Sequence, residues 1–196
     1  MRKFSLVAIA SMALLAGGAA TAGTSTFEDV ATGLYSSVVS GGVTYTFTSG
    51  NGMFNVDSQS PGAPISLHNL ISFFQNPGSG AFKATMAGGF SSFSIGMGDY
   101  NADDDIGHLE AYDASNNLLD SDSIFVPAPV FGGGTMTVSS ATPIAYVLFY
   151  ETGSFAGAVY WDNAEFKPAV PEPQTYALMA LGLAGLAAVA RRRKAK

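Results

Sequence analysis

The sequence predicts an all-β domain, an antiparallel β-sandwich of jelly-roll type, between two terminal segments of different character. Short segments in which apolar and polar residues alternate recur along the chain, separated by turn-forming residues. No segment between Thr24 and Lys167 sustains the 3.6-residue apolar period of an amphipathic helix. The chain has no cysteine, so the domain, residues 23–169, must be held together by its core.

The strands follow from this alternation. In the segment GVTYTFTSG, Val43, Tyr45 and Phe47 face one side while threonines face the other, as in a half-buried strand. The other segments of this kind are 52–57, 81–87, 90–98, 107–114, 135–140, 144–151 and 155–166. Turns are predicted at 50–52, 76–78, 115–117 and 132–134, which are rich in Gly and Asn. Residues 66–75 are compatible with a short helix or with a strand.

The first 22 residues have the pattern of a secretory signal. Arg2 and Lys3 precede an apolar run over residues 4–18, and Ala20 and Ala22 supply the small residues that a signal peptidase reads. We therefore expect residues 1–22 to direct export through the secretion machinery and to be cleaved by signal peptidase. The alternative is an uncleaved membrane anchor, for which the apolar run is short.

The central domain is strongly acidic. Between Gly23 and Val170 there are two lysines and fourteen carboxylates, a net charge of −12, against −6 for the whole chain. Such a surface repels nucleic acid and anionic membranes and attracts divalent cations. We therefore expect no nucleic-acid partner.

The densest group of carboxylates lies in the segment GDYNADDDIGHLEAYD, residues 98–113. The ligand positions of an EF-hand calcium loop are taken here by Asp99, Asn101, Asp103, Asp105 and Glu110. The loop glycine of an EF-hand is missing and the flanking segments are predicted strands, so we predict a calcium loop of another kind. The alternative is an Asx-rich turn whose carboxylates are solvated.

A second pair of acids is suggested by its place at the two ends of the domain. The segment TFEDV contains Glu28, and YWDNAEF contains Asp162. With these residues on the first and last strands, the chain resembles the jelly-roll carbohydrate-binding modules. The resemblance implies that Glu28 and Asp162 hold a structural calcium ion.

Sugar binding requires exposed aromatic faces beside hydrogen-bonding groups. Tyr100 lies inside the acidic segment and Tyr112 near its end, and we predict that both contact glycan. The sequence contains no zinc-binding histidine pair, no Gly-x-Ser-x-Gly motif and no cysteine nucleophile. We therefore expect no enzyme activity, although fourteen carboxylates also permit a pair that acts on glycosidic bonds.

The C-terminal segment combines three parts. Pro171, Glu172 and Pro173 precede an apolar stretch over residues 175–190, and a basic end follows at 191–196. As a helix, the apolar stretch would measure roughly 24 Å against a hydrocarbon core of about 30 Å. It spans the membrane if flanking arginines snorkel and the bilayer thins, with the basic end in the cytoplasm.

This order of parts closely resembles the PEP-CTERM sorting signal of exported bacterial proteins. The resemblance covers residues 170–196 and rests on Pro171, Glu172, Pro173, the apolar helix, and Arg191, Arg192 and Arg193. It implies recognition and cleavage by exosortase, a membrane enzyme of Gram-negative bacteria that produce extracellular polysaccharide. The precursor would be inserted in the inner membrane, and the mature protein would reach the cell surface or extracellular matrix.

We therefore expect an exported, non-enzymatic surface or matrix protein that binds glycan, with calcium stabilising the fold. One alternative is a purely structural matrix protein that assembles through an acidic, calcium-bridged surface. A glycoside-acting enzyme is a further alternative.

Overall fold

The structure, a computed structural model, describes residues 21–72, 80–100, 103–129, 131–153, 155–169, 182–183 and 185–186. The strands are β1 (Gly23–Ser25), β2 (Gly33–Tyr35), β3 (Ser37–Ser40), β4 (Val43–Phe47), β5 (Phe54–Asp57), β6 (Asn69–Ile71), β7 (Phe82–Asp99), β8 (Asp105–Tyr112), β9 (Leu118–Val126), β10 (Gly132–Gly153) and β11 (Tyr160–Pro168). Every strand pair is antiparallel.

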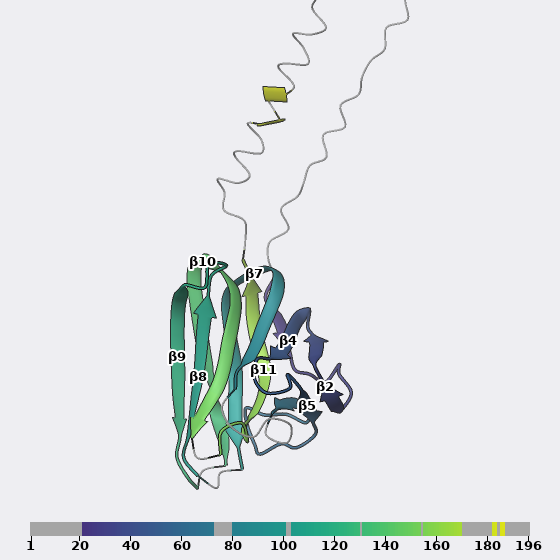
Figure 1. Cartoon of the computed structure of the whole chain (residues 1–196), viewed down its shortest axis with the longest axis vertical. Helices are drawn as coiled ribbons and strands as arrows, with labels where there is room; N and C mark the ends of the chain where they lie inside the picture. Colours follow the sequence, from purple (N-terminus) through teal and green to yellow (C-terminus); the bar gives the residue numbers. More distant parts are fainter. Residues whose placement is uncertain are drawn as a thin grey trace, which may run out of the picture.

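Two long strands, β7 and β10, belong to both layers of the molecule (Figure 1). The first part of β7 pairs with β4 and with the second part of β10, whereas its remainder pairs with β11 and with the first part of β10. The register between β7 and β10 shifts on either side of Ile144, opposite Gly88 and Gly89, whose φ values are +81° and +76°. Positive φ favours glycine, which allows the paired strands to bend together there.

One layer contains β9, β8, the end of β10, the start of β7, β4 and β3. The other contains the start of β10, the end of β7, β11, β6, β5 and β2, with β1 also paired to β11. This confirms the predicted antiparallel β-sandwich. The segment left open as helix or strand contains a strand, β6, at Asn69–Ile71.

Large aromatic side chains fill the space between the layers. Phe149 of β10 stacks on Phe82 with ring centroids 5.3 Å apart and lies 5.1 Å from the ring of Trp161 on β11. All three side chains are at most 2 % exposed. Burial of such rings is the main stabilising contribution in a domain without disulfides.

Three details of the predicted strands were wrong. The strand predicted over 155–166 begins only at Tyr160, because the residues from Phe155 form a turn closed by the Ala158 N–H group. Residues 81–87 and 90–98 form one strand, and 135–140 and 144–151 form another, because the chain bends without a break in pairing. The predicted turn at 132–134 is the start of β10. A Cβ atom on Gly133 would lie 1.8 Å from the carbonyl oxygen of Met97, so glycine serves close strand approach here rather than a turn.

The first part of β10 has a backbone edge that is covered by side chains of β9. Asp122 accepts a hydrogen bond from the Thr137 N–H group, and Asp120 accepts one from the Ser139 N–H group, both at 2.8 Å. Charged side chains at this position accept hydrogen bonds from the N–H groups of the strand edge, so that no further strand has to pair with it. β9 was not predicted, because these aspartates and the serines between them conceal its apolar positions.

The predicted signal peptide lies almost wholly outside the described residues. The predicted membrane helix, residues 175–190, also lies outside them except for four residues. Within the part of the chain that is described, no helix is long and apolar enough to cross a bilayer.

Candidate functional site

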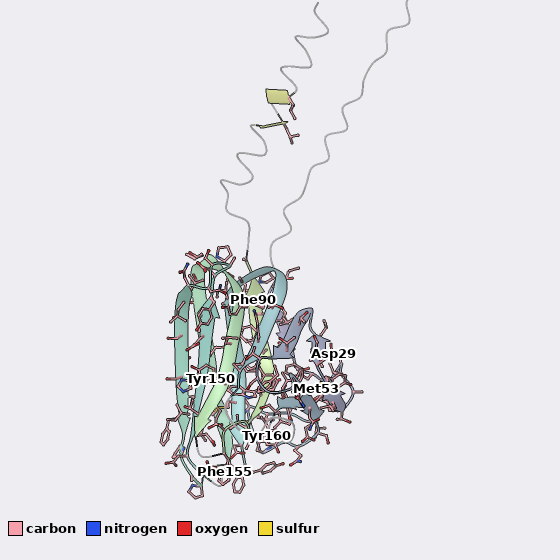
Figure 2. All side chains as sticks on the ribbon, viewed as in Figure 1. Asp29, Met53, Phe90, Tyr150, Phe155 and Tyr160 are labelled. Atoms are coloured by element: carbon pink, nitrogen blue, oxygen red, sulfur yellow. The ribbon has the colours of Figure 1, made fainter. Side chains whose placement is uncertain are left out.

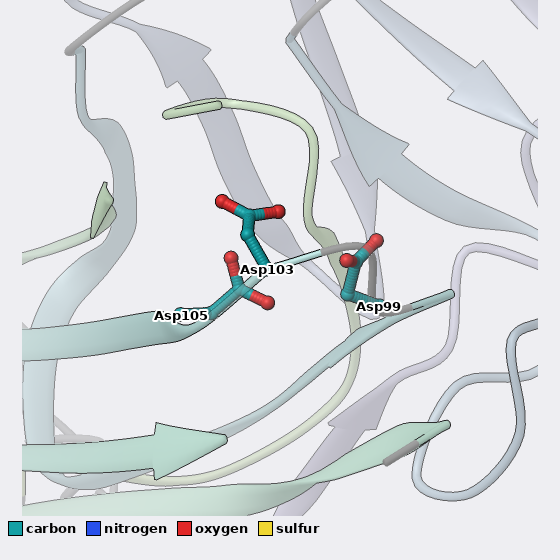
Figure 3. Close-up of side chains that lie close together, drawn as sticks. All are labelled: Asp99, Asp103 and Asp105. Atoms are coloured by element: carbon teal, nitrogen blue, oxygen red, sulfur yellow. The ribbon is translucent and has the colours of Figure 1, made fainter. Parts of the chain in front are cut away.

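Three aspartates meet where β7 ends and β8 begins. Asp99 is the last residue of β7, Asp105 is the first of β8, and Asp103 lies between the strands. Their candidate ligand oxygens all lie within 4.8 Å of one another. Figure 3 shows the three carboxylates turned toward a common space. We call these three residues, together with Glu151 described below, the carboxylate cluster.

Glu151 of β10 is the fourth member. It pairs in register with Gly107, while Asp105 pairs with Gly153, so the two acids lie on adjacent strands at the same end of the sandwich. Asp105 and Glu151 are each only 3 % exposed. One oxygen of each, Asp105 Oδ2 and Glu151 Oε1, is buried without a hydrogen-bond partner among the described residues, as is Asp103 Oδ2. Buried carboxylate oxygens normally accept a hydrogen bond or bind a cation.

The electrostatics of the cluster favour a bound positive charge. Burial, followed by the charges of the neighbouring carboxylates Asp99, Glu151, Asp103 and Asp104, raises the pKa of Asp105 to about 7. Burial also raises the pKa of Glu151, although the Gly157 N–H group that donates to its Oε2 at 2.8 Å lowers it. An all-oxygen donor set of this span suits calcium, whose ligands lie 2.3–2.6 Å from the ion. The three aspartates are therefore the residues whose oxygens span a distance that suits calcium, and Glu151 lies near enough for its charge to act on Asp105.

Two residues of the predicted calcium loop are not in the described cluster. Asn101 lies outside the described residues. Glu110 lies five residues beyond Asp105 on β8, roughly 17 Å away along an extended strand. The EF-hand spacing therefore does not describe this cluster. An extended strand places Glu110 far from the loop, whereas the short rise per residue of a helix would keep it near the ion.

Glu151 was missed by the sequence analysis, although the sequence contains a signal for it. In the segment IAYVLFYE, the alternation that buries Val147 and Phe149 also places Glu151 on the inward face. A carboxylate at a core position requires a partner. That requirement, rather than spacing along the chain, points to the fourth ligand.

The second predicted calcium pair also lies close together. β1 pairs with β11, which carries Asp162, whereas Glu28 lies three residues beyond β1 and not on it as predicted. The charge of Glu28 nevertheless acts on Asp162. Asp162 is fully buried and accepts hydrogen bonds from the backbone and hydroxyl of Ser66 and from the Asn163 N–H group. Burial raises its pKa, and these donors lower it. Calcium binding at Glu28 and Asp162 stays a prediction.

Asn69 adds a side-chain oxygen beside Asp162. It is fully buried, and the pairing of Leu70 with Trp161 places it opposite Asp162. Its Nδ2 group donates to two carbonyl oxygens, whereas its Oδ1 has no partner among the described residues. Glu28 accepts a hydrogen bond from the His68 N–H group at 3.1 Å, which holds it beside this strand.

The two predicted glycan-contacting tyrosines lie at opposite ends of the sandwich. Tyr100 follows the carboxylate cluster, is 42 % exposed and makes edge contacts with Phe131 and Tyr160. Tyr112 is at the far end of β8, where it stacks on Tyr146 with ring centroids 5.0 Å apart. They cannot contact the same sugar unit.

Tyr112 belongs to a ladder of rings on the outer face of β8 and β10. His108 stacks on Tyr150 at 4.9 Å, and the Nζ atom of Lys83 lies 4.0 Å from the centre of the Tyr146 ring. Glu110 accepts hydrogen bonds from Tyr112 and Tyr150, at 2.6 Å and 3.0 Å. The rings of this ladder therefore face one another, and their polar groups are paired within the protein.

The C-terminal segment matches a family model described as the PEP-CTERM protein-sorting motif, over residues 169–194. The chain carries a PEP-CTERM sorting signal. This motif implies export, a membrane-anchored precursor, and exosortase as the processing partner. The PEP-CTERM segment follows directly on β11, whose last residue is Pro168. The predicted motif residues Pro171, Glu172, Pro173 and Arg191 to Arg193 lie inside the matched range but outside the described residues.

No curated protein matches the chain. The sandwich is similar to the K3 cleaved adhesin domain of Lys-gingipain from Porphyromonas gingivalis W83, with 15 % identity, a TM-score of 0.45, and coverage of 74 % of this chain and 96 % of that one. It is also similar to a Clostridium thermocellum xylanase 10B structure containing a CBM22-1 module and a GH10 module with xylohexaose, with 8 % identity and a TM-score of 0.40. That match covers 64 % of this chain and 26 % of the xylanase chain. These likenesses concern the fold.

Proposed function

We propose that this PEP-CTERM protein is a non-enzymatic component of the cell surface or extracellular matrix that binds calcium and glycan. The sorting signal supports the destination. The carboxylate cluster supports the calcium, and the exposed aromatic side chains beside it support the glycan. Calcium stabilises the folded domain in this proposal.

The observation that carries the proposal is the burial of Asp105 and Glu151, each with one oxygen that has no hydrogen-bond partner within the described ranges. Two buried carboxylates, with Asp99 and Asp103 beside them, destabilise the fold when ionised and uncompensated. Calcium is abundant outside cells and prefers carboxylate oxygens. An exported domain with no disulfide gains from such an ion, because binding to the folded state alone raises its stability.

The test of calcium binding uses the processed protein recovered from the producing bacterium. We expect isothermal titration to show calcium binding, and a chelator to lower the Tm by an amount that added calcium restores. Magnesium at the same concentration is the control, because it demands a smaller octahedral site. Equal melting curves with calcium and with chelator would contradict the calcium part of the proposal.

The test of glycan binding is retention of the same protein on a glycan array and on exopolysaccharide purified from the producing bacterium. Retention with calcium is the expected result. Failure to bind any glycan would favour the structural matrix protein, which predicts calcium-dependent self-association instead. Release of shortened oligosaccharides after incubation would favour a glycoside-acting enzyme.

A further inference from the structure

The two ends of the sandwich differ in what they present. Gly23 pairs with Phe166, and β11 ends at Pro168, so the chain enters and leaves the sandwich at one end (Figure 1). The carboxylate cluster lies at the other end, where Gly98 pairs with Tyr160. Between Tyr160 and Pro168, β11 rises about 26 Å at roughly 3.3 Å per residue. Figure 2 shows Phe90 near one end of the sandwich and Phe155 and Tyr160 near the other.

The end with the carboxylate cluster also carries exposed aromatic rings. Phe131 is 68 % exposed, Phe155 56 % and Tyr100 42 %. The Tyr100 ring meets Phe131 at 6.4 Å and Tyr160 at 5.8 Å, both nearly perpendicular. Rings exposed together on a soluble domain usually mark a binding surface. We call this end, made of the carboxylate cluster with Tyr100, Phe131 and Phe155, the tip.

Each exposed ring is connected to a member of the carboxylate cluster. Tyr100 follows Asp99 directly, and Phe131 precedes Gly132, which pairs with Asp99. The Ala158 N–H group donates a hydrogen bond to the Phe155 carbonyl oxygen at 3.0 Å and so closes a turn. Within this turn, the Gly157 N–H group donates to Glu151. A cation that draws the carboxylates together therefore also sets the spacing of the rings.

We propose that the tip is a calcium-dependent glycan-binding site, in which Tyr100 and Phe131 contact the apolar face of a sugar ring. This inference rests on the proposed function and assigns its location. Without calcium, the four carboxylates of the cluster repel one another and any anionic polysaccharide, whereas a bound cation reduces both repulsions and can accept oxygen ligands from a sugar. The tip also lies at the end of the sandwich opposite Pro168, the last residue of β11.

The ring ladder on the outer face of β8 and β10 is the competing location. Its rings are less available, because Tyr146 lies between Tyr112 and the Lys83 ammonium group. The hydroxyls of Tyr112 and Tyr150 already donate to Glu110. A sugar bound there would have to break these interactions, whereas Phe131 and Tyr100 are open to solvent.

The experiment compares two double variants of the processed protein by affinity electrophoresis in purified host exopolysaccharide. In calcium, Tyr100→Ala with Phe131→Ala is expected to weaken binding roughly tenfold or more, since two aromatic contacts are lost. Tyr112→Ala with Tyr146→Ala removes the ladder contact that the sequence predicted for Tyr112, and if the tip is the site this variant binds as the wild type does. Asp105→Asn is expected to remove the calcium dependence of glycan binding. Circular dichroism and Tm verify the folding of every variant. A neutral glucan and a uronate-containing polymer distinguish a hydroxyl from a carboxylate ligand.

Three results would overturn the inference. If the wild type binds and the tip variant binds equally well, the site lies elsewhere while the proposed function stands. If the ladder variant alone loses binding, the ladder is the site. If the wild type binds no glycan in calcium, both the inference and the glycan part of the proposed function fail.

Discussion

Asp105 of β8 and Glu151 of β10 are buried on adjacent strands, each at 3 % exposure and each with one carboxylate oxygen that has no hydrogen-bond partner in the part of the chain that the structure describes. Asp105 pairs with Gly153 and Glu151 pairs with Gly107, so both acids lie at the same end of the β8–β10 strand pair. A pair of this kind is stable when a cation lies between the carboxylates or when one of them keeps its proton.

The first prediction concerns these two acids. At a calcium concentration 100 times the Kd, binding is expected to stabilise the fold by about 2.7 kcal/mol, roughly 5–10 °C in Tm for a domain of this size. Asp105→Asn or Glu151→Gln should abolish this rise in scanning calorimetry while leaving the calcium-free Tm equal or higher, because a buried charge is removed. Glu110→Gln is the control and should keep the full rise. If the Glu110 variant lost the calcium-dependent rise in Tm, Glu110 would be a calcium ligand, as the EF-hand spacing predicts.

The second prediction concerns pH and the ring ladder. The hydrogen bond that Tyr112 donates to Glu110, together with burial and the charge of Glu110, raises the pKa of Tyr112 to about 12. The stabilisation from this bond is therefore complete below pH 10 and is lost as the pH rises through 12. In an ultraviolet titration of phenolate absorbance, Glu110→Gln should lower this pKa, and Tyr112→Phe should remove the step. Identical titrations of wild type and Glu110→Gln would contradict the role of Glu110.

The third prediction concerns the covered edge of β10. Asp120→Ala with Asp122→Ala removes the acceptors for the Thr137 and Ser139 N–H groups, at a cost of about 0.5–1.5 kcal/mol each. The larger effect should be association, because a bare strand edge pairs with other chains. Urea unfolding and light scattering measure the two effects. The double Asn variant keeps an oxygen acceptor at each position and should behave as the wild type; aggregation of both variants alike would indicate a charge effect instead.

The fourth prediction concerns the core between the layers. Phe149→Ala should lower the free energy of unfolding by about 3–5 kcal/mol, a large part of the 5–15 kcal/mol typical of a domain. The reason is that its ring contacts both Phe82 and Trp161. Phe125→Ala is the control, since that ring is 57 % exposed, and its effect should stay within about 0.5 kcal/mol. Similar urea midpoints for the two variants would mean that Phe149 does not join the layers.

Much of the fold follows from local pattern. Val43, Tyr45 and Phe47 alternate with threonines because one side of β4 is buried, and that rule is visible in any half-buried strand. β9 escaped prediction because its inward Asp120 and Asp122 accept hydrogen bonds from backbone N–H groups of the next strand, β10, so polar residues occupy positions where apolar ones are expected. The glycines at 132–134 were read as a turn because a glycine needed for close packing looks the same in sequence as one needed for a turn.

The sequence by itself determined the sorting signal, the sandwich class and the acidic segment from Asp99 to Asp105, because each depends on residues that are neighbours in the chain. Only the tertiary structure decided which carboxylates meet. Glu110, twelfth in the predicted loop, is carried away along β8, and Glu151 arrives from β10 through strand pairing. The physical reason is that a strand extends by about 3.3 Å per residue, so ligands on β-strands converge across strands rather than along them.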